Sequence, residues 1–138
     1  MKIFQILERQ LHFTDEDEVV TQSDLNELET YLDRLYAAND IDFDFTRHFL
    51  DRINDVRNRR QITTKELFVM FGKAAKQYGD KIANLGDQAE AVITDVNSKL
   101  NSPFVLNWDK RNRMMRLVAK TVMRKANFKS SNMKLNVR

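Results

Sequence analysis

The chain contains no cysteine, and glycine (3) and proline (1) are scarce among its 138 residues. The absence of cysteine excludes disulfides, thiolate zinc sites and cysteine nucleophiles, and it suits a reducing cytosol. The scarcity of glycine and proline indicates regular elements joined by short, polar turns. No stretch approaches the 18 consecutive apolar residues of a membrane span, so no membrane partner is expected.

The N-terminal residues MKIFQILERQ lack the apolar core and the small-residue cleavage site of a secretory signal. We therefore expect the protein to act in the cytoplasm where it is made, or to be carried elsewhere inside another particle. The sequence does contain enough apolar material for one core, since 42% of the residues are hydrophobic and nine are Phe. A chain of this length fits a single domain.

Charge is distributed unevenly along the chain. Residues 1–45 carry three cations and twelve acids, a net charge of −9, whereas residues 46–138 carry twenty cations and eight acids, a net charge of +12. Residues 110–138 hold ten Lys or Arg and no acid. Such a block attracts phosphate backbones through counterion release and long-range steering, so RNA or DNA is the expected partner. The alternative is a solvated tail that serves only solubility.

Helical periodicity marks the first half of the chain. A helix over 23–37, capped by Ser23, is predicted from an apolar stripe made of Leu25, Leu28, Leu32 and Leu35. A second helix is predicted over 46–58, with Phe49, Ile53 and Val56 on its apolar face.

A third helix is predicted to begin at the capping box formed by Thr63 and Glu66, to reach about Tyr78 and to stop at Gly79. The alternating residues 42–45 predict an extended lead-in or a short strand.

The second half of the chain changes to strand-like patterns. Strands are predicted within 89–97, 103–108 and 114–123, and residues 109–112 form a four-residue hairpin turn. The fold class is therefore α+β, with two or three N-terminal helices packed on a three- to four-stranded antiparallel sheet in a single domain. We divide the chain into an acidic N-terminal helical segment (1–45), an α+β core (46–124) and a loosely held basic tail (125–138).

One polar stripe on the second helix carries candidate chemistry. At 100° per residue, Arg52, Asp55 and Arg59 fall close to His48. Histidine moves protons near neutral pH, and arginine binds phosphate and stabilises charge that develops on it, which suits phosphodiester cleavage. No metal or cofactor is required if the attacking group is the RNA 2′-hydroxyl. The alternative interpretation is a solvated helix face with a structural histidine at the edge of the core.

Other catalytic patterns have less support. Asp42 and Asp44 could bind a cation, but two acids at this spacing occur often by chance. Trp108 could stack a base, although an aromatic beside a hairpin more often closes a core. No P-loop, dinucleotide-binding glycine turn, HExxH or GxSxG motif is present.

The stretches RHFLDRINDVRNRRQIT, AVITDV, PFVLNW and LVAKTVMRKANFKSSN resemble small proteins of tailed phages. Their layout over about residues 44–130 is similar to the barnase–EndoU–colicin–RelE-like nucleases, which place His and Arg on a helix before an antiparallel sheet. The resemblance implies an endoribonuclease acting in the host cytoplasm, with a catalytic set made of His48, Arg52, Arg57 and Thr121. With one histidine in this region, the second proton-transfer group stays open between Lys120 and Thr121. The cations expected to bind nucleic acid are Arg59, Arg60, Lys110, Arg111, Arg113, Arg116, Lys120, Arg124 and Lys125.

The first eight residues, MKIFQILE, are similar to the targeting segments of phage internal head proteins, which implies packaging in the virion. Two further functions stay open beside the nuclease. One is a non-catalytic virion or nucleic-acid-binding protein. The other is an inhibitor that binds another phage or host protein through acids at positions 15–18, 24, 27 and 29. In a nuclease, the acidic N-terminal helix would mask the basic surface, and deleting residues 1–40 would then increase activity.

Overall fold

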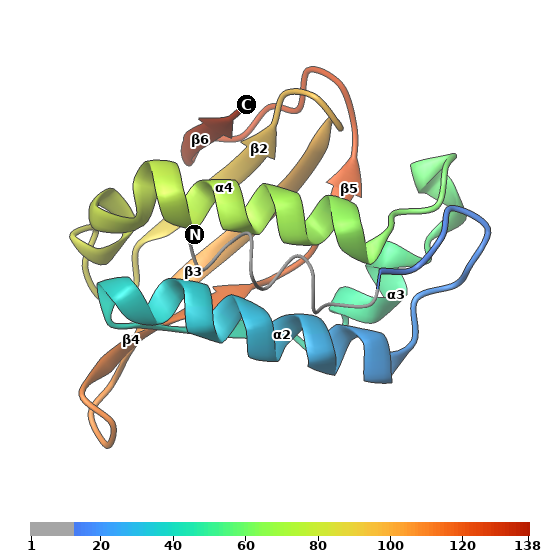
Figure 1. Ribbon diagram of the computed structural model, residues 1–138. Coiled ribbons are helices and arrows are strands. Elements are labelled where there is room, and N and C mark those ends of the chain that lie inside the picture. The colour runs from blue at the N-terminus through green and yellow to red at the C-terminus, as the bar shows by residue number, and fades with distance from the viewer. Residues whose placement is uncertain (1–12) are drawn as a thin grey trace.

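The computed structural model describes residues 13–138 as a layer of helices on one face of a sheet (Figure 1). The helical elements are α2 (Gln22–Tyr36), η1 (Ala37–Asn39), α3 (Phe49–Ile53), η2 (Val56–Asn58) and α4 (Thr64–Ala83). The strands are β1 (Ile41–Phe45), β2 (Glu90–Asp95), β3 (Leu100–Asp109), β4 (Met114–Ala119), β5 (Met123–Arg124) and β6 (Met133–Val137). The predicted α+β class is confirmed.

The sheet is mixed, with the order β1-β4-β3-β2-β6 and with β5 paired to the far end of β3. The hairpin predicted at 109–112 joins β3 to β4, which pair antiparallel, and β2 also pairs antiparallel with β3. However, β1 lies parallel to β4, and β6 lies parallel to β2. The expectation of a three- to four-stranded antiparallel sheet was therefore wrong in strand number and in direction. Parallel partners come from distant parts of the chain, so a local pattern cannot reveal them.

The last fourteen residues are not a loose tail throughout. Within them β6 pairs with β2 along its length, and the side chains of Leu135 and Val137 are buried in the core. The expectation failed because this strand is short and its alternating apolar residues are set among cations.

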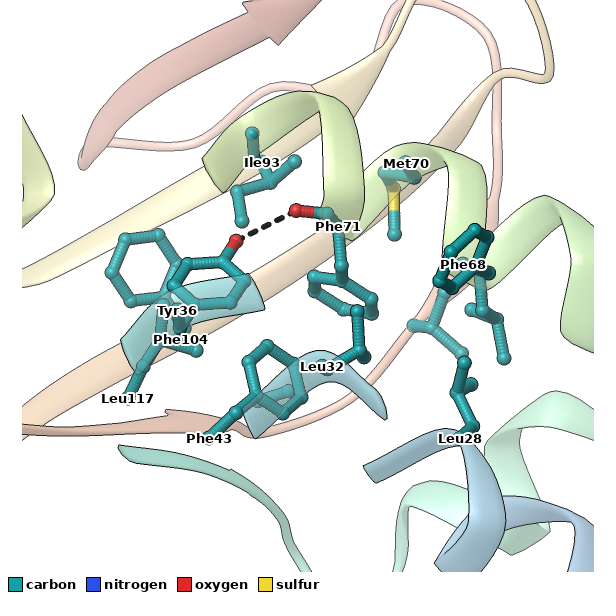
Figure 2. Packing of buried hydrophobic residues seen from close by; sticks show 14 of the residues in the cluster. Leu28, Leu32, Tyr36, Phe43, Phe68, Met70, Phe71, Ile93, Phe104 and Leu117 are labelled. Atoms are coloured by element: carbon teal, nitrogen blue, oxygen red, sulfur yellow. Dashed lines mark hydrogen bonds between the residues drawn. The ribbon is translucent and has the colours of Figure 1, made fainter. Parts of the chain in front are cut away.

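The predicted leucine stripe of α2 is confirmed, since all four leucines are buried. The N-cap is Thr21 rather than Ser23, because the Thr21 hydroxyl accepts from Asp24 N while the Asp24 carboxylate accepts from Thr21 N. In the core, the buried Tyr36 hydroxyl donates to the Phe71 carbonyl at 2.9 Å and so ties α2 to α4 (Figure 2).

The capping box of Thr63 and Glu66 begins α4 as predicted. The helix continues to Ala83 instead of stopping at Gly79. A Cβ at Gly79 would clash with the side-chain amide of Asn39, so this glycine allows η1 to approach α4 closely. The close contact with Asn39 therefore accounts for a small residue at position 79, where the sequence predicted the end of the helix.

The helix expected over 46–58 is much shorter, because α3 ends at Ile53 and Val56 is 89% exposed. The Asn54 side chain accepts from Val20 N and donates to Val20 O, and Asp55 Oδ1 accepts from Arg57 N. Such side-chain bonds to backbone compete with helical hydrogen bonds.

Residues 1–12, including the proposed targeting segment MKIFQILE, lie outside the described residues. Within the described range, no helix is long and apolar enough to span a membrane.

Candidate nucleic-acid cleft

A β-bulge interrupts the strand predicted over 114–123. Between the pairs Phe104–Ala119 and Asn101–Met123, β3 advances by three residues while the opposing segment advances by four. The extra residue shifts the alternation, so Val122 is buried in place of Thr121. Regular alternation over the predicted strand 114–123 would place Leu117, Ala119, Thr121 and Met123 on one face, and this expectation is wrong. Bulges often re-aim side chains beside active sites, and here the bulge turns Thr121 out of the core.

Beside this bulge lies a cleft of about 1150 Å³, which we call the basic cleft. One wall comes from α3 and the loop that follows it, and the other wall comes from residues 120–126. The four residues predicted as catalytic, His48, Arg52, Arg57 and Thr121, all line it. The cleft also contains five of the predicted nucleic-acid-binding cations, Arg59, Arg60, Lys120, Arg124 and Lys125.

Aromatic packing anchors the backbone next to His48, which lines the cleft. The next residue, Phe49, is fully buried, and its ring centroid lies 4.5 Å from that of Phe45 at the end of β1. His48 itself is exposed and precedes the first turn of α3. The Thr46 hydroxyl donates to the Lys120 carbonyl at 2.7 Å, which fixes this turn to the opposite wall. The imidazole is therefore carried on a well-anchored backbone.

Asn58 joins the two walls at the floor of the cleft. Its buried side chain donates to the Arg52 carbonyl at 2.8 Å and accepts from Arg124 N at 3.1 Å. The next residue, Arg59, has φ 68° and ψ −45°, and Arg60 N donates to the Asn58 carbonyl at 2.7 Å. This is a strained γ-turn, a conformation that persists only where the surroundings impose it. This turn lies in the arginine loop, residues 57–60, which lines one wall of the cleft.

Arg124 forms internal hydrogen bonds that support the cleft, and little of its side chain is exposed to solvent. Its guanidinium donates to both carboxylate oxygens of Glu66, at 2.8 and 2.9 Å, and to the carbonyls of Ser98 and Gln61. The Arg124 side chain is 11% exposed. Although partial burial of Glu66 favours its neutral form, bonding to Arg124 lowers the pKa of that carboxyl below its ordinary value. Arg124 was predicted to bind phosphate, but its guanidinium is already paired with the Glu66 carboxylate.

Asp55 organises the cations of the α3 wall. Its carboxylate accepts from Arg57 at 2.6 Å and lies 3.8 Å from Arg52 Nη1. Bonding to the Arg57 side chain and backbone lowers the pKa of Asp55 to about 2. This single carboxylate holds two guanidiniums beside each other. The cleft lining has seven Lys or Arg and one acid, so it stays strongly positive.

The remaining predicted cations lie elsewhere. Lys110, Arg111 and Arg113 are exposed on the β3–β4 turn, and Arg116 binds Asp44 of β1. Asp44 is therefore engaged by a cation of the protein itself. Among residues 13–138, no group of three or more acidic or histidine side chains is placed to hold a metal ion.

The acidic N-terminal segment does not line the cleft in the described part of the chain. Asp15 and Glu16 border a second, smaller pocket beside Lys65 and Lys73. Asp24 is used in the capping box of α2, and Glu29 accepts from Phe45 N. These contacts give no support to masking of the cleft by the acidic helix. They also show that Asp24 and Glu29, two acids of the inhibitor hypothesis, form hydrogen bonds within the protein itself.

Sequence reasoning missed the residues that hold the cleft together, chiefly Asn58 and Glu66. Their partners are 66 and 58 positions away along the chain, so no local signal could identify them beyond the capping-box role of Glu66. In comparisons with known proteins, no family model, no curated protein and no solved structure matches the chain.

Proposed function

We propose that the protein is an endoribonuclease that cleaves RNA without a metal ion, with the basic cleft as its active site. The observation that carries the proposal is that His48, Arg52, Arg57 and Thr121 all line one positively charged cleft beside a β-bulge. These residues come from segments more than sixty positions apart. A cleft that combines a histidine with several guanidiniums suits a phosphodiester substrate.

The chemistry needs two proton transfers. The 2′-hydroxyl oxygen bonds to the adjacent phosphorus while the bond from phosphorus to the 5′-oxygen breaks, which leaves a 2′,3′-cyclic phosphate. One group accepts the 2′-hydroxyl proton, and another donates a proton to the leaving 5′-oxygen. His48 takes one of these roles, and Arg52 and Arg57 stabilise the charge on the phosphate oxygens.

The contacts of Lys120 count against that residue as the second proton-transfer group. The Lys120 ammonium donates to Glu90 at 3.0 Å, on the sheet side of the cleft wall. Thr121 and the exposed Lys125 both line the cleft, and neither side chain has a hydrogen bond or ion pair within the described residues. We propose that Thr121 or Lys125 takes the second role. The host cytoplasm is our proposed place of action, on the strength of the resemblance alone.

The test is incubation with labelled single-stranded RNA in excess chelator. We expect wild-type cleavage, a loss of about 10²- to 10⁴-fold in His48→Ala, and no cleavage of the 2′-deoxy oligonucleotide. The matched control is Arg47→Ala, which alters the exposed neighbouring residue outside the cleft lining. Equal rates in wild type and His48→Ala would refute the assignment.

A second candidate is a nucleic-acid-binding protein without catalysis. It is favoured by the engagement of several cleft cations with Asp55 and Glu66, which leaves fewer groups to act on a substrate. It predicts RNA binding without cleavage, unchanged in His48→Ala and weakened by Arg59→Glu.

A further inference from the structure

The hairpin formed by β3 and β4 carries a second basic surface, well apart from the cleft. Figure 1 shows the hairpin extending past the helices at one end of the sheet, whereas α3 and β5 lie at the other end. From Met114 to Ala119, β4 spans about 17 Å at the usual rise per residue. A ligand in the basic cleft therefore reaches this hairpin only if it is extended.

The tip of the hairpin is built rigidly. Asp109 Oδ1 accepts from Arg111 N at 3.0 Å and from Asn112 N at 3.2 Å, and Asn112 Nδ2 donates to Asp109 Oδ2 at 2.8 Å. Lys110, Arg111 and Arg113 are exposed around this turn and form no ion pair within the described residues. Asp109 and the neighbouring Asp87 face these cations, but both carboxylates accept backbone N–H groups.

Trp108 stands at the base of this turn and is 46% exposed. Its backbone N donates to Asp87 Oδ1 at 2.7 Å, so the backbone of the residue is fixed while the indole meets solvent. An aromatic residue beside a hairpin usually covers the hydrophobic core, but this indole is largely exposed to solvent. An exposed aromatic ring beside cations on a rigid support is the combination that binds unpaired bases and their phosphates.

We infer that the hairpin is a second contact for single-stranded RNA, with a base stacked on Trp108 and phosphates bound by Lys110, Arg111 and Arg113. The inference rests on the proposed function, because the same RNA strand occupies the basic cleft. Two linked contacts raise the affinity for strands long enough to reach both. The hairpin thus favours long, unpaired substrates over short ones.

The test uses Trp108 as its own probe, since it is the one tryptophan of the chain. In the His48→Ala background, which keeps RNA intact, tryptophan fluorescence is followed during titration with 4- and 20-nucleotide oligouridylate. Anisotropy of the labelled RNA reports binding independently. We expect the 20-mer to quench the fluorescence and Trp108→Ala to weaken its binding by about 5- to 150-fold, as expected for a lost stacking contact. The 4-mer should bind with little effect of the substitution.

Charge is tested by comparing two triple variants with the same change in net charge. Lys110→Glu, Arg111→Glu and Arg113→Glu should weaken binding of the 20-mer far more than Lys65→Glu, Lys76→Glu and Lys81→Glu, which alter exposed positions on α4. Binding of the 20-mer without quenching, or equal effects of the two triple variants, would overturn the inference and leave the hairpin to a protein partner. Absence of RNA cleavage by the wild type, with quenching intact, would instead count against the proposed function alone.

Discussion

The acidic edge of the sheet and the basic cleft use charge in opposite ways. At the edge, four carboxyl groups gather between α2 and β1, from Glu29, Asp33, Asp42 and Asp44. Glu29 accepts from Phe45 N at 3.2 Å, and Asp33 accepts from Phe43 N at 2.6 Å. These bonds satisfy N–H groups of β1, the strand at the edge of the sheet. In the cleft, the cations line an open surface instead.

The pKa values show the same contrast. Burial, with added repulsion and hydrogen bonding from Asp44, raises the pKa of Glu29 to about 7, and burial raises the pKa of Asp33 to about 6. In the cleft, bonding to Arg57 lowers the pKa of Asp55 to about 2. Some acids of the first third therefore form hydrogen bonds that support the fold, whereas many of the cations are exposed to solvent. The net charges of −9 and +12 therefore separate acids that partly support the fold from cations that are mostly exposed.

Deletion of residues 1–40 should have the largest effect on the contrast between the acidic edge and the basic cleft. This change removes α2, whose four leucines and Tyr36 belong to the core, so we expect loss of the cooperative thermal transition in circular dichroism. As a control, Glu16→Gln with Asp17→Asn removes exposed acid charge and should keep both the fold and the RNA affinity. A folded, more active truncation would restore the masking hypothesis.

The next largest effect is expected at the floor of the cleft. Arg124→Met leaves Glu66 without its bidentate partner, and loss of hydrogen bonds between charged, partly buried groups costs about 1.5–3 kcal/mol of unfolding free energy. Lys120→Met breaks the exposed pair with Glu90 and should cost less than about 1 kcal/mol. Urea unfolding of the two variants measures the difference. Similar losses would mean that the floor and the rim of the cleft are equally dispensable.

The smallest expected effect is a pH dependence set by the acidic edge. Because Glu29 and Asp33 bind protons more tightly when folded, their contribution to stability is fully present below the ordinary carboxyl pKa and is lost as pH rises through about 6 and 7. Both groups are half-exposed, so water limits the change to about 1 kcal/mol or less. Urea midpoints between pH 5 and 8 should fall with pH. The variant Glu29→Gln with Asp33→Asn should flatten the slope, and an unaltered slope would assign it to other groups.

Local signals predicted the parts of the fold that depend on neighbours in the chain. The leucine stripe of α2, the capping box at Thr63 and the hairpin turn near 109–112 follow from spacing and turn chemistry, and the structure contains all three. The helix over 46–58 failed because Asn54 and Asp55 bond to backbone groups, one of them 34 positions away. A periodic pattern cannot reveal such competition.

The sequence by itself determined the α+β class, the helical stripes and the separation of acidic from basic halves, because these depend on residue type and short spacing. Tertiary structure alone decided that β1 and β6 join the sheet in parallel and that one extra residue turns Thr121 outward. It also decided that Asn58 connects the two walls and that Glu66 binds Arg124. Each of these features depends on a partner far along the chain. Packing of the whole core determines which distant segments of the chain come together. This packing places His48 and Thr121 in the lining of one cleft.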